Sequence, residues 1–104
     1  PAAPAGSTPM KLPRVIEMTT TRADFVRLLP AAVDHMEFMD CGDAFTHQAA
    51  GRGWRIGFAA MPELRIGLIC LERHRVDFSF SGYSEAEIDA FLARFELHFR
   101  RGGG

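Results

Sequence analysis

Cysteine is scarce in this chain. The 104 residues include only Cys41 and Cys70, and neither belongs to a CxxC or CxxCH segment. Two cysteines do not make a disulfide framework, and the standard spacings of zinc and c-type haem sites are missing. Such cysteine usage is typical of a reducing compartment. We therefore expect a cytoplasmic protein, and the richness in Ala, Arg and Gly favours a bacterial source.

The chain also lacks an excess of charge of either sign. Twelve basic and 13 acidic residues give a formal net charge of −1, so there is no global attraction to nucleic acid or to an anionic membrane. No apolar run approaches the roughly 18 residues of a membrane span. GxGxxG and GKS/T loops, which would hold a nucleotide, are missing as well. We expect no nucleic-acid partner and no membrane contact.

The N-terminal part differs in composition from the rest. Residues 1–17 are rich in Pro and Ala and show no charged segment followed by an apolar one, so they do not resemble an intact signal peptide. We interpret 1–17 as a flexible leader or an added tail, with a short extended piece at 15–16. Residues 18–101 then form one α+β domain, and 102–104 a flexible glycine tail.

Two helices are expected, one near each end of the domain. Ser84 and Glu87 form a capping box, and an apolar stripe follows at helical spacing, which predicts a helix over about 84–100. Thr21, with Asp24 three residues later, caps a second helix over about 22–29. Pro30 removes a backbone donor and should kink or end that helix, with at most one extra turn at 31–34.

Five strand-like segments lie between the helices. They span 35–41, 44–50, 54–60, 64–71 and 76–80, with turns at 51–53, 61–63 and 72–75. Alternation in the fourth segment places Leu64, Ile66, Leu68 and Cys70 inward. Short connections between strands favour antiparallel neighbours. The expected fold is an α+β two-layer sandwich: a four- to five-stranded antiparallel meander covered on one face by the two helices.

The open face of this sheet is the main functional candidate. Arginines recur there once per strand, around glycines that leave gaps in the surface; the residues are Arg55, Arg65, Arg75, Gly57 and Gly67. Exposed aromatics, which RNA-binding sheets use for stacking, are missing from this face. We expect a small non-catalytic accessory protein that binds a protein partner or forms a homodimer, through this face or through an unpaired edge strand.

Two binding alternatives involve the segment around residue 40. Imidazole, thioether and thiolate groups gather there, as a copper or zinc site would require; the candidates are His35, Met39, Cys41 and His47. If 35–41 is a strand, the first three share one face and His47 on the next strand can reach them. The weaker alternative is a small-molecule pocket between helices and sheet, lined by Trp54, Met36, Met39 and Phe38.

The sequence contains no recognisable catalytic set of residues. Cys41 has Asp43 and His47 nearby, but Asp40 and Asp43 would disfavour the thiolate that a nucleophilic cysteine needs. Acidic residues recur every three positions over 34–43, which is typical of a solvated surface segment. No Ser/His/Asp set is present in the folded part. The sequence therefore predicts a protein that is not an enzyme.

Overall fold

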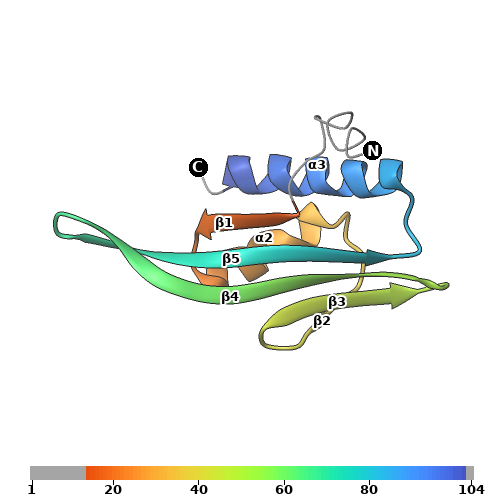
Figure 1. Ribbon diagram of the computed structural model, residues 1–104, viewed down its shortest axis with the longest axis horizontal. Helices are drawn as coiled ribbons and strands as arrows, with labels where there is room; N and C mark the ends of the chain where they lie inside the picture. The colour runs from red at the N-terminus through yellow and green to blue at the C-terminus, as the bar shows by residue number, and fades with distance from the viewer. Residues whose placement is uncertain (1–13, 103–104) are drawn as a thin grey trace, which may run out of the picture.

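The computed structural model describes residues 14–102, which form one five-stranded sheet and two helices (Figure 1). In chain order the elements are β1 (Val15–Thr19), α2 (Arg22–Ala32), β2 (Met39–Asp40), β3 (Ala44–Ala49), β4 (Arg52–Ile66), β5 (Ile69–Ser81) and α3 (Glu85–Gly102). The strand order is β1-β5-β4-β3-β2, and every neighbouring pair is antiparallel. The expected α+β sheet-and-helix fold is confirmed. The leader residues 1–13 and the last two glycines lie outside the described residues.

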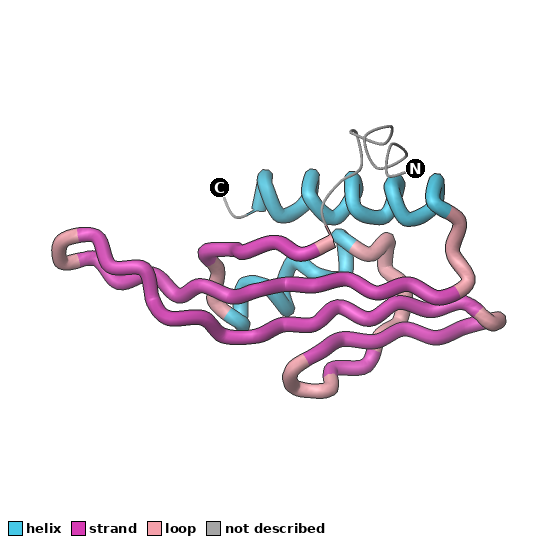
Figure 2. Tube along the Cα trace, in the orientation of Figure 1, coloured by secondary structure: helices cyan, strands magenta, loops and turns pink. Residues whose placement is uncertain are grey.

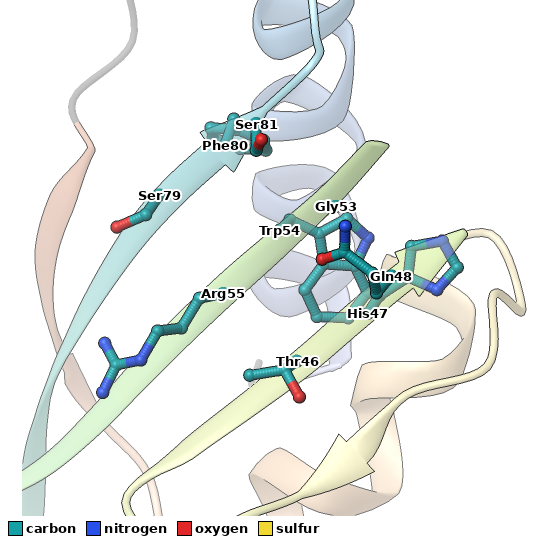
Figure 3. Close-up of a pocket in the computed structure, with 9 residues that line it drawn as sticks. All are labelled: Thr46, His47, Gln48, Gly53, Trp54, Arg55, Ser79, Phe80 and Ser81. Carbon is teal, nitrogen blue, oxygen red and sulfur yellow. The ribbon is translucent and has the colours of Figure 1, made fainter. Parts of the chain in front are cut away.

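Both helices lie on the same face of the sheet, and Figure 3 shows them together behind the strands. They are joined to the sheet by a core rich in phenylalanine. Phe25 of α2 stacks on Phe58 of β4, with ring centroids 4.3 Å apart, and on Phe99 of α3 at 4.9 Å. Phe95 of α3 meets Phe78 of β5 edge-on at 4.8 Å. These rings hold both helices against β4 and β5 at the centre of the molecule.

The capping signals place both helix starts correctly. Ser84 N donates to Glu87 Oε1 at 2.8 Å, and Glu87 N donates back to Ser84 Oγ at 3.2 Å. The predicted capping box is therefore confirmed, and α3 follows it directly. Thr21 Oγ1 accepts a bond from Asp24 N at 3.1 Å at the start of α2.

Pro30 was expected to kink or end the first helix, and the structure shows that the helix does not end there. Helix α2 runs through Pro30 to Ala32, because proline removes a single helical donor and the residues after it still donate to carbonyls of the helix. The turn is closed by Val33 N, which donates to Leu29 O at 3.0 Å, and by His35 N, which donates to Pro30 O at 2.7 Å.

The N-terminal strand begins earlier than the expected domain boundary. Residues 15–19 form β1, which pairs along β5 from Val15↔Asp77 to Thr19↔Arg73. The sheet therefore starts before residue 18 and includes part of what we interpreted as leader. The expected strand over 35–41 is much shorter, since only Met39–Asp40 pairs with β3.

The largest difference from the predicted fold is the β4–β5 hairpin. The turns expected at 61–63 and 72–75 are wrong: β4 continues to Ile66, the chain reverses at Gly67 and Leu68, and β5 starts at Ile69. A bulge between Met61 and Leu64 absorbs Pro62 without breaking the strand, as is usual for proline at a bulge or an edge. Gly67 has φ +62°, which suits the first position of a two-residue hairpin turn.

The β4–β5 hairpin extends beyond the other strands of the sheet. Pairing with β3 stops at Gly57 and pairing with β1 stops at Arg73, whereas β4 and β5 pair with each other as far as Ile66↔Ile69. Figures 1 and 2 show the hairpin extending past both helices and β1 at one end of the molecule. We call residues 61–72 the hairpin tip.

Candidate functional site

The hairpin tip carries an exposed apolar face. Cross-strand partners lie on the same side of a sheet, and the tip pairs Leu64 with Leu71 and Ile66 with Ile69. The exposed fractions of Leu64, Ile66 and Ile69 are 36%, 58% and 57%, and Leu68 at the turn is fully exposed. The predicted burial of Leu64, Ile66, Leu68 and Cys70 is therefore wrong. The bulge between Met61 and Leu64 turns Leu64 and Ile66 to the side of the sheet away from the helices. Cys70 lies on the helix side but is exposed, because the hairpin extends past both helices there.

This apolar face continues the open face of the sheet. Strand β5 has no bulge, so side chains alternate strictly along it; Arg75, Arg73, Leu71 and Ile69 therefore lie on the side away from the helices. Arg65 pairs with Cys70 and lies on the other side of the tip. The three arginines expected on one face thus divide: Arg55 and Arg75 share the open face, and Arg65 does not.

The two glycines that were expected to leave flat gaps have different roles. A Cβ on Gly57 would overlap the carboxylate of Asp77, its cross-strand partner. The gap above Gly57 is therefore filled by Asp77, whose Oδ1 also lies 3.8 Å from Arg55 Nη1. Gly67 is in the hairpin turn, where a Cβ would meet nothing within 4 Å.

A shallow depression lies at the opposite end of the open face (Figure 3). Its centre is one cross-strand row in which Arg55 stands between Thr46 of β3 and Ser79 of β5. The depression has a volume of about 210 Å³. Two hydroxyls beside a guanidinium can hold a carboxylate from a partner, although Asp77 already lies close to Arg55. This end of the face is polar, and the tip end is apolar.

The four residues of the expected metal site are not brought together. Met39 pairs with Thr46 on the open face, whereas His47, the next residue of β3, lies on the helix side. His47 stacks on Trp54, and its Nδ1 is 2.6 Å from Glu37 O. Cys41 Sγ lies 3.8 Å from Thr46 Oγ1.

His35 lies in the loop after α2, with φ +60°. Within residues 14–102 no three His, Cys, Asp or Glu side chains are grouped so that they could hold a metal ion. Copper or zinc binding stays a prediction.

The acidic segment is divided among separate contacts. Asp40 accepts two bonds from Arg22 Nη2, at 2.6 and 2.7 Å, and one from Gly42 N at 2.9 Å. These contacts, first the Gly42 N–H and then Arg22, lower the pKa of the Asp40 carboxyl. Asp34 pairs instead with Arg94 of α3, at 3.4 Å. Asp34 and Asp40 therefore bind different arginines and do not form a carboxylate pair. Cys41 is exposed and lies in the turn between β2 and β3.

Aromatic rings fill the interior where a small-molecule pocket was expected. Trp54 is buried, and its ring lies 6.2 Å from Phe38 and 5.6 Å from Phe91. Phe38 in turn meets Phe45 edge-on at 5.9 Å. Met39, which was expected to line the pocket, is on the opposite side of the sheet. Binding of a small molecule at this place stays a prediction.

Sequence reasoning missed the hairpin tip as a site. The signal was present in the consecutive pattern Leu64-Arg65-Ile66-Gly67-Leu68-Ile69, in which Gly67 between two aliphatic pairs is typical of a hairpin turn. No helix of the described residues is long and apolar enough to cross a membrane. No protein-family profile matches the chain, and neither the curated proteins nor the solved structures include a significant match to it.

Proposed function

We propose that this chain is a small non-catalytic protein-binding module whose contact element is the β4–β5 hairpin tip. The observation that carries the proposal is the apolar face formed by the exposed side chains of Leu64, Ile66 and Ile69 and the half-buried Leu71, with Leu68 at its end. Exposed clusters of this kind mark interaction sites on soluble proteins. Burial of one such side chain by a partner contributes roughly 1.5–3 kcal/mol.

The core does not need this face. The buried residues nearest the tip are Phe58 on β4 and His74 on β5, and the ring of His74 stacks on Phe58 at 4.1 Å. Its Nδ1 is also within 2.9 Å of Thr20 O. Beyond Phe58 and His74, only the two strands of the β4–β5 hairpin pair with each other. A two-stranded hairpin is marginal by itself, so an apolar face retained there is best explained by a partner that covers it.

The contact uses the face of the hairpin and not its edge. Beyond Gly57 the outer edge of β4 is not paired by β3, which would invite an added strand. Pro62 offers no N–H on that edge, and the bulge between Met61 and Leu64 interrupts its regularity. Both features block strand addition, so side-chain packing on the apolar face is the binding mode that remains.

Charge and cysteine usage agree with a protein partner in a reducing compartment. The hairpin tip contains Glu63, Arg65 and Glu72, a net charge of −1, so it has no electrostatic preference for nucleic acid or anionic lipid. Cys41 and Cys70 are both exposed free thiols, which suits a cytoplasmic location.

The proposal is tested with a shortened hairpin. Residues 62–72 are replaced by Asn-Gly, which joins the cross-strand partners Met61 and Arg73 through a two-residue turn. Both proteins are expressed at native level in the source organism, and lysates are separated by size-exclusion chromatography. We expect the full chain to elute as a complex larger than 11.5 kDa and the shortened chain as a monomer.

Circular dichroism and the urea midpoint of the purified proteins should be the same, which shows that the core is intact. If the shortened protein elutes with the same complex as the full chain, the tip is not the contact element and the proposal fails.

A further inference from the structure

The apolar face of the tip runs directly into a basic part of the open face. Along β5 the side chains on this face are Ile69 and Leu71, and then Arg73 and Arg75. Alternate residues of a strand are about 6.6 Å apart, so Arg75 lies roughly 13 Å from Leu71. A partner that packs on the tip and follows the open face therefore meets aliphatic side chains first and two arginines next.

The arginines of this face differ in what they already contact. Arg55 Nη1 lies 3.8 Å from Asp77 Oδ1. Glu17 is the cross-strand partner of Arg75, yet its carboxylate lies next to Arg73, with Oε1 4.0 Å from Nη1. Arg75 is exposed, and within the described part of the chain its side chain has no ion pair and no hydrogen bond. Its guanidinium is therefore available to a partner.

We propose, on the basis of the function proposed above, that the protein docked on the tip presents an acidic side chain to Arg75. Its apolar side chains cover Leu64, Ile66 and Ile69, and an Asp or Glu further along the same surface reaches the guanidinium. A guanidinium holds a carboxylate through two parallel hydrogen bonds, and arginine is enriched among the residues that dominate binding energy at protein interfaces. The free arginine thus specifies the chemistry of the partner, which the apolar face alone does not.

A second copy of the chain fits this surface poorly. The register places Arg55, Arg73 and Arg75 on the open face with two carboxylates, Glu17 and Asp77. Both carboxylates already lie beside arginines. A face-to-face contact between two copies would therefore bring Arg75 no free carboxylate and would set basic groups against basic groups. An acidic partner instead supplies the counter-charge that Arg75 lacks.

An anionic lipid surface offers the same combination of apolar and acidic groups, but the far side of the tip argues against it. Arg65 and Glu72 are exposed on the side of the hairpin opposite to the apolar face. Insertion of the tip into a bilayer would surround both sides with lipid, where charged side chains are costly. A protein covers the apolar face alone and leaves both charges in water. The two-sided hairpin therefore favours a protein partner.

Charge reversal tests the role of Arg75 in the complex. Arg75→Glu should reduce the amount of complex that elutes from cell lysate by about tenfold or more, because it sets like charges against each other. Arg65→Glu, on the far side of the tip, is the matched control and should leave the complex unchanged. The urea midpoints of both purified variants should match that of the unchanged chain, because both positions are exposed.

Zero-length cross-linking tests the chemistry of the partner while the positive charge is retained. Lys11 is the only lysine of the chain, so Arg75→Lys with Lys11→Arg leaves a single lysine amine, at position 75. A carbodiimide added to the eluted complex joins this amine to a carboxylate in direct contact with it, and mass spectrometry identifies the linked residue. We expect an adduct to an Asp or Glu of a different protein. Arg65→Lys with Lys11→Arg should give none.

Four results would overturn the inference: a complex that Arg75→Glu leaves at its normal level, no adduct to another protein from position 75, an adduct that forms equally well from position 65, or an adduct to a second copy of this chain. A fifth is flotation of the purified chain with phosphatidylcholine–phosphatidylserine vesicles that is lost in Arg75→Glu, because this would assign the surface to a membrane. If the shortened hairpin loses the complex but Arg75→Glu keeps it, the acidic partner is excluded and the proposed function stands. If the shortened hairpin also keeps the complex, both fail.

Discussion

The carboxylate of Asp77 occupies the space directly above Gly57, where any larger residue would place its Cβ. The two residues are cross-strand partners on the open face, and Asp77 also lies 3.8 Å from Arg55. Glycine in the middle of a strand normally weakens it. Here its absence of a side chain allows an acidic residue to lie flat on the sheet beside an arginine.

Gly57→Ala should therefore destabilise the fold, although alanine suits a strand better than glycine does. The new methyl group displaces the half-exposed Asp77 carboxylate toward solvent and away from Arg55, and the loss of such an exposed contact costs up to about 1 kcal/mol. Urea unfolding of Gly57→Ala, Asp77→Ala and the double variant measures the coupling. The alanine at 57 should be tolerated once Asp77 is removed. Additive effects in the double variant would show that Asp77 is not what excludes a side chain there.

The aromatic core predicts a contrast between two neighbouring residues of α3. Phe95 is 1% exposed and stacks on Phe99 at 4.4 Å, so Phe95→Ala should lower the free energy of unfolding by about 3–5 kcal/mol. Leu97→Ala, at a position 46% exposed, should change it by less than about 0.5 kcal/mol. Chemical denaturation of both variants measures the difference. Equal effects would mean that α3 packs on the sheet through another face.

Two carboxylates should make the fold sensitive to acid. The Ser84 N–H lowers the pKa of Glu87 from its ordinary 4.5, and Arg52 adds to this; the Gly42 N–H and Arg22 lower that of Asp40 from 3.8. A carboxyl whose pKa is lower in the folded state contributes stability above its unfolded pKa and loses it as the pH falls through the folded value.

Stability should thus decline as the pH falls below about 4.5, and the decline should be shallower in Glu87→Gln and Asp40→Asn. Urea unfolding between pH 7 and pH 2.5 measures the slopes. Slopes in both variants that match that of the unchanged chain would show that these hydrogen bonds do not favour the charged forms.

Local signals made most of the fold predictable. The Ser84–Glu87 capping box and the Thr21 cap act within four residues, so their effect is visible in the sequence. Clean alternation over 54–60 placed Trp54, Ile56 and Phe58 on the covered face, where the structure has them buried. Each of these features depends on nearest neighbours along the chain.

The predictions that are wrong concern features that depend on how the strands pair with one another. Alternation at Leu64 and Ile66 correctly indicates a strand, but it does not reveal the bulge between Met61 and Leu64, which turns both side chains to the face away from the helices. Pro62 resembles a turn residue, and only the unpaired outer edge of β4 allows it to remain in a strand. The metal candidates Met39 and His47 lie on opposite faces of the sheet because of the strand register. Met39 pairs with Thr46 on the open face, which leaves His47, the next residue of β3, on the helix side.

The tip should contribute almost nothing to folding. Ile66→Ser with Ile69→Ser removes two exposed side chains that lie outside the core, so the free energy of unfolding should change by no more than about 0.5 kcal/mol for each residue. Thermal and urea unfolding of the dilute protein, at 1 µM or less, measure this without any effect of association. A loss of several kcal/mol would show that the apolar face is structural and not a binding surface.

If another protein docks on the hairpin tip, photo-cross-linking in living cells will capture it there. A benzophenone amino acid is placed at Leu68 in the tip or at Leu97 on α3, both exposed leucines, and the cells are irradiated. We expect a discrete protein adduct from position 68 that disappears when Ile66 and Ile69 are changed to serine, and none from position 97. No adduct from position 68, or an adduct that persists in the serine background, would contradict it.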